Sequence, residues 1–331
     1  MAEEHNEADP AAKPPLGNQA LRELDALRND IREGRFQRSL ALLAGGASLI
    51  SGLEVSYEHY RGSYSQRVMY TPVVLSVALF GAGVWGFCSR NAARTVLRLC
   101  SAFTLADSVV GFSFHLRGIA RKPGGWRLPL TNIMMGPPVF APLLFGTAAY
   151  LGLIASFLRR EGSERSSDTG APGDGRNTGA GKLLPAALGH DLISFEQDVR
   201  EGRFQQHMLV VTAVSALLSG SEAWYSHYKN GFRYASQSAP VVLAPVLALA
   251  CIAATKEQKL AKTAVPALSA AAIIVAGIGF FYHARGILRR PGGAGYLPYN
   301  IIYGPPIFAP LLFGAAGGIG LLASQLRRSA A

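Results

Sequence analysis

A long stretch of this sequence occurs twice, and the duplication limits the folds open to the chain more than any other feature. Residues 114–146 read FHLRGIARKPGGWRLPLTNIMMGPPVFAPLLFG, and residues 282–314 read YHARGILRRPGGAGYLPYNIIYGPPIFAPLLFG. One offset of 168 residues aligns 30–160 with 198–328 without a gap, and about two in five aligned positions are identical. We interpret this internal repeat as a gene duplication that produced two units of one fold.

The composition places both units in a membrane. Of the 331 residues, 49% are hydrophobic and 16% are charged, and the mean hydropathy is +0.20. In soluble proteins about 25% of residues are charged. The charged residues here also stay outside the long apolar runs, a pattern typical of membrane spans. The chain is therefore predicted to be a multi-pass membrane protein whose partner is the lipid bilayer.

Each copy contains four apolar runs. They cover 39–56, 68–88, 96–114 and 138–158 in the first copy and 208–225, 239–254, 264–281 and 306–324 in the second. Four spans return the chain to its starting side, so both copies have the same orientation. The expected fold class is an all-α integral membrane protein with eight transmembrane helices, arranged as two tandem parallel four-helix repeats with pseudo-two-fold symmetry.

The polar segments divide the chain further. Residues 1–18 are predicted to be a disordered tail, because they are rich in charge, proline and alanine. The first repeat covers 19–160 and opens with an amphipathic surface helix over 19–37. Residues 161–190 are predicted to be a flexible linker rich in glycine, serine and aspartate. The second repeat covers 191–331.

The net charge of +11 comes mainly from basic residues at the ends of the apolar runs. Most of them lie on the side that holds both termini and the linker, which predicts an inner-membrane protein with cytoplasmic termini. Nucleic-acid binding is not predicted, because the chain has no basic polar domain with aromatic residues. The three cysteines, Cys88, Cys100 and Cys251, have no paired spacing, so a disulfide framework is not expected.

The polar residues common to both copies are predicted to lie at one end of the two bundles. The first and third spans run in the same direction, so their last residues reach the same depth. The candidate ligand or metal-binding residues are Glu54, His59, His115, Glu222, His227 and His283. The supporting polar residues are Tyr57, Arg117, Arg121, Asn132, Tyr225, Arg285, Arg289 and Asn300.

These residues favour three alternative functions. Two histidines at equal depth are suited to axial ligation of haem, and two histidines with a carboxylate are suited to iron or another divalent metal. Such sites would make the protein a redox or metal-binding module. The arginines instead fit a transporter of a small polar or anionic solute. In the third alternative the polar blocks stabilise loops of a structural or accessory subunit, alone, as a homo-oligomer or with other membrane proteins.

The carboxylates admit a simpler interpretation as well. An ionised glutamate near a membrane boundary is costly unless it is paired, so Glu54 is equally suited to an ion pair with Arg117 or Arg121. Asp107 lies in the middle of the third run, and the position aligned with it in the other copy is Val275. It is therefore either a local functional group or a paired acid. No phosphate-binding loop or nucleophile elbow is present, so catalysis is left open.

Overall fold

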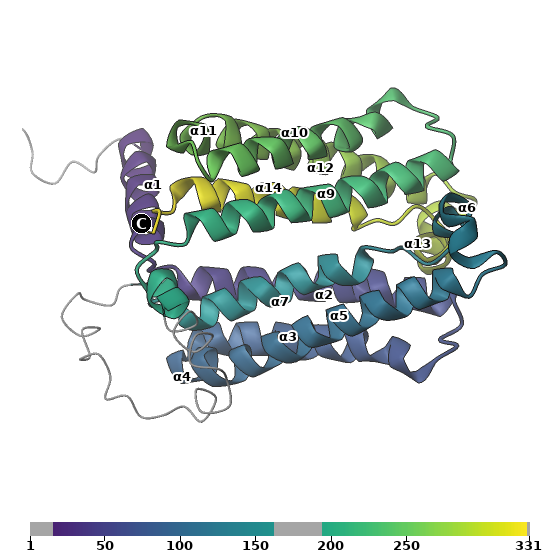
Figure 1. Ribbon diagram of the computed structural model, residues 1–331, viewed down its shortest axis with the longest axis horizontal. Helices are drawn as coiled ribbons and strands as arrows, with labels where there is room; N and C mark the ends of the chain where they lie inside the picture. Colours follow the sequence, from purple (N-terminus) through teal and green to yellow (C-terminus); the bar gives the residue numbers. More distant parts are fainter. Residues whose placement is uncertain (1–15, 162–193, 330–331) are drawn as a thin grey trace, which may run out of the picture.

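The computed structural model describes residues 16–161 and 194–329, and every regular element in those ranges is helical (Figure 1). The predicted tail lies almost entirely outside the described residues, and so does nearly all of the predicted linker. The first half contains α1 (Leu16–Arg32), α2 (Gln37–Arg61), α3 (Thr71–Cys88), α4 (Arg90–Ala92), α5 (Arg98–Ala120), α6 (Pro129–Met134) and α7 (Ala141–Phe157). Three short helical turns connect them, Arg67–Tyr70, the π-helical Ala93–Leu97 and Gly125–Arg127.

The second half follows the same order. A helical segment over 194–200 comes first. It is followed by α9 (Gln205–Lys229), α10 (Ala239–Ala254), α11 (Gln258–Lys262), α12 (Ala264–Leu288), α13 (Leu297–Ile302) and α14 (Ala309–Gln325). Two 3-10 turns, Ala235–Ser238 and Gly293–Tyr296, precede α10 and α13.

Six helices of the described part are long and apolar enough to cross a membrane. They are Gln37–Arg61, Arg67–Cys88, Arg90–Ala120, Gln205–Lys229, Ala235–Ala254 and Ala264–Leu288. The predicted multi-pass, all-helical class is confirmed, with six of the eight expected spans matched by such a helix. The other two expected spans correspond to α7 and α14, with 17 residues each. At 1.5 Å per residue each is about 26 Å long, somewhat less than the hydrocarbon thickness of about 30 Å.

Small residues bring the helices of each half into close contact. A Cβ on Gly83 of α3 would lie 2.6 Å from the carbonyl oxygen of Ala41 on α2. In the second half, a Cβ on Gly317 of α14 would lie 2.6 Å from the carbonyl oxygen of Ser269 on α12. Helices in a membrane associate largely by such close backbone packing, because lipid tails are as apolar as leucine. The apolar side chains on the outside, such as Val74 and Phe103 at 65% exposure, are then available to lipid.

The two halves lie side by side with their long helices roughly parallel (Figure 1). Helices α2, α3, α5 and α7 form one layer of the picture, and α9, α10, α12 and α14 form the other. Contacts between α7 and α9 and between α14 and α2 join them, and the buried apolar cluster contains residues of both halves. We call the end that carries α6 and α13 the loop end, and the opposite end, near α1, the junction end.

At the junction end the two copies of the sequence REGRFQ meet. A Cβ on Gly34 would lie 2.6 Å from the carbonyl oxygen of Arg200, and a Cβ on Gly202 would lie 2.6 Å from that of Arg32. The rings of Phe36 and Phe204 stack with centroids 6.5 Å apart. The backbones of the two halves are therefore in direct contact here.

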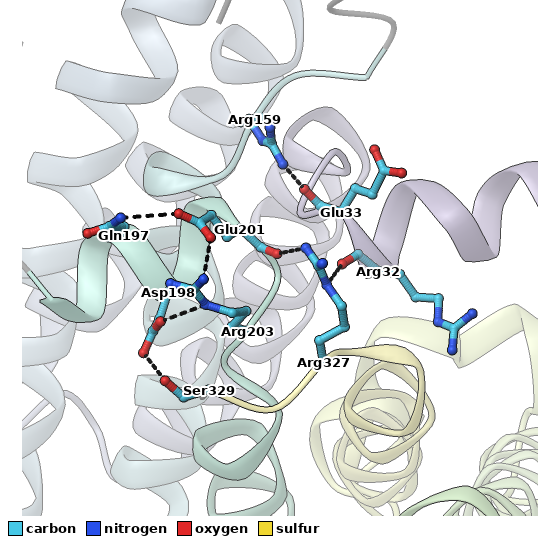
Figure 2. A network of polar contacts seen from close by, with 9 residues as sticks. All are labelled: Arg32, Glu33, Arg159, Gln197, Asp198, Glu201, Arg203, Arg327 and Ser329. Atoms are coloured by element: carbon cyan, nitrogen blue, oxygen red, sulfur yellow. Dashed lines mark hydrogen bonds and ion pairs between the residues drawn. The ribbon is translucent and has the colours of Figure 1, made fainter. Parts of the chain in front are cut away.

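Arg327, at the end of the second half, connects both copies of this motif (Figure 2). Its Nε donates to the carbonyl oxygen of Arg32 at 2.7 Å, and its terminal nitrogen donates to the carbonyl oxygen of Glu201. Helix α1 lies across the end of the second half and contacts α14 (Figure 1). Leu21 and Leu24 on it are more than 60% exposed, so the helix presents the apolar stripe expected of the amphipathic segment.

Candidate functional site at the loop end

The two shared glutamates each cross to the opposite half. Glu54, on α2, accepts a hydrogen bond at its Oε2 from the backbone N–H of Phe308, 3.0 Å away. Glu222, on α9, accepts one at its Oε1 from the backbone N–H of Phe140, 2.6 Å away. Phe308 and Phe140 are the N-cap residues of α14 and α7. A negative charge is favourable at a helix N-terminus, where N–H groups lack partners and the helix dipole is positive.

The sequence explains why these helices need a cap from outside. Neither Phe140 nor Phe308 has a side chain that can accept a hydrogen bond, and neither helix has a side-chain cap of its own. Each helix has a proline at its first turn, which removes one of the unpaired N–H groups. The helices begin three residues after the expected starts at 138 and 306. The glutamate of the other half supplies the missing acceptor.

Three of the four shared histidines lie within hydrogen-bond distance of a backbone carbonyl oxygen in their own half. Nδ1 of His115 lies 2.5 Å from the carbonyl oxygen of Pro138, and Nδ1 of His283 lies 2.5 Å from that of Pro306. Nδ1 of His59 lies 2.7 Å from the carbonyl oxygen of Met69, in the turn before α3. With Nδ1 donating its proton to a carbonyl, the lone pair of each ring is on Nε2.

The structure also brings two of the predicted histidines together. The rings of His227 and His283 lie edge to face with centroids 6.3 Å apart. No group of three or more His, Cys, Asp or Glu side chains in the described ranges is arranged to hold a metal ion. The predicted carboxylate therefore does not complete a three-ligand set with these imidazoles in the described residues, because Glu222 instead bonds to the first half.

The two predicted asparagines close the turns before α6 and α13. Nδ2 of Asn132 donates to the carbonyl oxygens of Pro123 and Gly125, at 3.0 and 2.7 Å. Asn300 makes the same two bonds in the second half. Gly124 has a φ of +81°, a conformation that favours glycine. Both asparagines are at most 4% exposed, so they brace the turns from the inside.

The remaining predicted residues lie around this framework. Tyr57 is buried, and Tyr225 is half-buried with Nζ of Lys229 5.1 Å from its ring centroid. The four arginines, Arg117, Arg121, Arg285 and Arg289, are exposed. Within the described residues Glu54 forms no ion pair with Arg117 or Arg121, and its carboxylate instead lies beside Tyr57 and accepts from the backbone N–H of Phe308.

The contact between halves is what sequence reasoning missed. It predicted one polar site within each bundle, whereas both glutamates bond across the interface. The sequence did contain a signal for this contact. Two helix starts lack Ser, Thr, Asp or Asn as an N-cap, and two glutamates shared by the copies are available at the same end of the bundles. The three cysteines are free, in keeping with the absence of paired spacing.

Together the helices and this loop end define a multi-pass helical membrane protein with a cross-braced polar end. No protein-family model, curated protein or solved structure matches the chain. Its function must therefore be argued from its own geometry.

Proposed function

We propose that the chain is a structural or accessory membrane subunit, a rigid scaffold built from two four-helix units. The observation that carries this proposal is the reciprocal capping at the loop end. Glu54 bonds to Phe308 and Glu222 bonds to Phe140, so each half supplies the acceptor that a helix of the other half lacks. A side chain held in this way serves assembly of the fold.

The same proposal includes eight spans and a pseudo-two-fold axis along the membrane normal. Equivalent hydrogen bonds in the two halves support the symmetry. The N–H of Gln37 donates to Arg159 O at 3.2 Å, and the N–H of Gln205 donates to Arg327 O at 3.1 Å. Helices α7 and α14 pack along α5 and α12, which supports their crossing the membrane despite their length. The basic residues near both termini favour an inner membrane with the junction end in the cytoplasm.

The use of the other shared polar groups points the same way. Asn132, Asn300 and at least three of the four shared histidines bond to backbone carbonyl groups of turns and helix starts. An enzyme site instead directs several unpaired groups at one point where a substrate can lie. A scaffold that keeps its loop end in one conformation needs the arrangement seen here.

The test compares Glu54→Ala, Glu222→Ala and the double variant with Glu58→Ala, a control on the same helix whose partner is the exposed Arg61. Each cap removed is expected to lower the free energy of unfolding in detergent by about 0.5–2 kcal/mol. The control is expected to stay within about 0.5 kcal/mol of the wild type. Cap variants as stable as the control would contradict the scaffold.

Metal binding is a second candidate, favoured by one observation. His227 and His283 lie close together, and the Nδ1 of His283 is tied to a carbonyl, as is usual in histidines that bind metal through the other nitrogen. Elemental analysis and an absorption spectrum of the purified protein, beside His227→Ala, test it and separate haem from a metal ion. Bound metal or haem that is lost in the variant would replace the purely structural proposal.

Solute transport receives no such support. Two grooves of the described residues lie within single halves, one between α3 and α5 and the other between α9 and α10, so neither one supplies a polar path between the halves.

A further inference from the structure

A groove on the first half contains a carboxylate that the reciprocal caps do not use. It runs between α3 and α5 and has a volume of about 550 Å³. Its lining residues are Tyr70, Thr71, Val74, Leu75, Phe103, Ala106, Asp107 and Val110. Val74 and Phe103 are 65% exposed, so the groove opens on the surface that faces lipid.

Asp107 is the acidic residue of this groove. Its Oδ1 accepts a hydrogen bond from the hydroxyl of Thr71, 2.6 Å away. Thr71 is the first residue of α3, and the candidate span to which it belongs begins at Arg67. Tyr70 lies between them and is 52% exposed. Arginine and tyrosine at the start of a span are typical of the headgroup boundary, so the carboxylate, which contacts Thr71, lies about one helical turn inside that boundary.

A carboxylate at this place is costly unless a donor or cation meets it. The hydroxyl of Thr71 supplies one hydrogen bond, whereas an ionised carboxylate has room for about four. No Lys or Arg in the described ranges forms an ion pair with Asp107. The side chain therefore has acceptor capacity directed at a lipid-facing groove.

The second half shows that the fold does not require this polar pair. The positions that match Thr71 and Asp107 are Ala239 and Val275, and Phe103 is matched by Ala271. The helices at those positions, α10 and α12, form and pack without the pair. A feature that one copy lacks and the other keeps in a costly environment points to a task separate from folding.

We propose that this groove binds a phospholipid with a primary ammonium headgroup, such as phosphatidylethanolamine. The ammonium donates to Asp107, and the upper part of an acyl chain lies against Val74 and Phe103. A primary ammonium can both neutralise the carboxylate and donate hydrogen bonds to it, whereas the quaternary ammonium of phosphatidylcholine has no N–H to donate. Selectivity for the first lipid over the second follows.

The position of the groove favours lipid over a second copy of the chain. The described spans carry their Lys and Arg residues toward their ends, and α10 carries none. A second copy brings a span-end cation to Asp107 only in one particular orientation, whereas lipid headgroups lie all around the protein near this depth. A partner helix that carries a lysine is the other occupant, and the test below separates it.

The experiment reconstitutes the full chain in nanodiscs that contain phosphatidylglycerol with either phosphatidylethanolamine or phosphatidylcholine. Native mass spectrometry then measures the lipid that remains bound after transfer to detergent. The wild type is expected to retain phosphatidylethanolamine about tenfold better than phosphatidylcholine, the ratio that one charge-assisted hydrogen bond of about 1.5 kcal/mol provides. Asp107→Val and Asp107→Asn are expected to abolish this preference.

Two controls keep the outcome clear. Glu58→Gln removes a carboxylate near the same end but outside the groove, and it should leave the preference unchanged. Glu54→Ala tests the scaffold and should also leave it unchanged, so failure of one proposal does not carry over to the other. Equal retention of both lipids by the wild type, or a preference that persists in folded Asp107→Val, overturns the lipid site. A membrane protein that copurifies with the wild type and is lost in Asp107→Val overturns it in favour of a partner helix.

Discussion

At the loop end the shared polar side chains mainly form hydrogen bonds to backbone groups, and Asn132 is the clearest case. Its side chain joins the carbonyl groups of Pro123 and Gly125, which lie nine and seven residues before it. Because it is 4% exposed, water cannot replace those bonds when they are lost. The side chain therefore keeps the Pro-Gly-Gly turn in one conformation.

Replacing Asn132 with alanine is expected to lower the free energy of unfolding by about 1–3 kcal/mol, the cost of leaving buried carbonyl groups without a donor. Asn300→Ala is expected to cost a similar amount, because Asn300 makes the equivalent bonds at 3.2 and 3.0 Å. Asn230→Ala is the control, since that exposed side chain bonds to a carbonyl oxygen at the end of its own helix. Thermal unfolding of the three variants in one detergent measures the difference. Equal stability of all three would show that the turns do not depend on the buried amides.

At the level of elements, the sequence predicted the helices better than their ends. Apolar runs located the long helices α2, α3, α5, α9, α10 and α12, because burial in lipid is a property of composition. The third span was expected over 96–114, whereas helical turns, including the π-helical Ala93–Leu97, extend from Arg90 to Ala120. Polar helix ends that project beyond the apolar run leave no signal in hydropathy. The same limitation hid the short α6 and α13 within the long loops.

Close packing within a half predicts opposite effects at two neighbouring glycines of α14. A Cβ on Gly317 would lie 2.6 Å from Ser269 O, whereas a Cβ on Gly318 would have no atom within 4 Å. Gly317→Ala is therefore expected to destabilise the protein by about 1–3 kcal/mol, the usual cost of overpacking. Gly318→Ala is expected to stabilise it by about 0.5–1 kcal/mol through helix propensity. Unfolding measurements in detergent would contradict this packing if the two variants changed stability in the same direction.

At the level of the whole molecule, the relation between the halves is what the sequence left open. The duplication predicted two similar units and a shared orientation. It could not show that Glu54 reaches Phe308, 254 residues away, because a repeat aligns Glu54 with Glu222 and says nothing of contacts between copies. Polar residues predicted to form a site within each half are partly used to join the halves. Only the position of one unit against the other reveals that use.

The junction end offers a direct test of that joining through Gly34. Gly34 has a φ of +70°, which a Cβ makes unfavourable by about 1–2 kcal/mol, and the added Cβ would also lie 2.6 Å from Arg200 O of the other half. Gly231 has the same φ of +70° with no atom near its Cβ position. Gly231→Ala therefore measures backbone strain alone, and Gly34→Ala measures strain plus the clash between halves. We expect Gly34→Ala to lower the free energy of unfolding by at least about 1 kcal/mol more than Gly231→Ala, the lower end of the cost of overpacking. Equal losses in the two variants would mean that the halves separate at the junction without cost, and that the caps at the loop end alone hold them together.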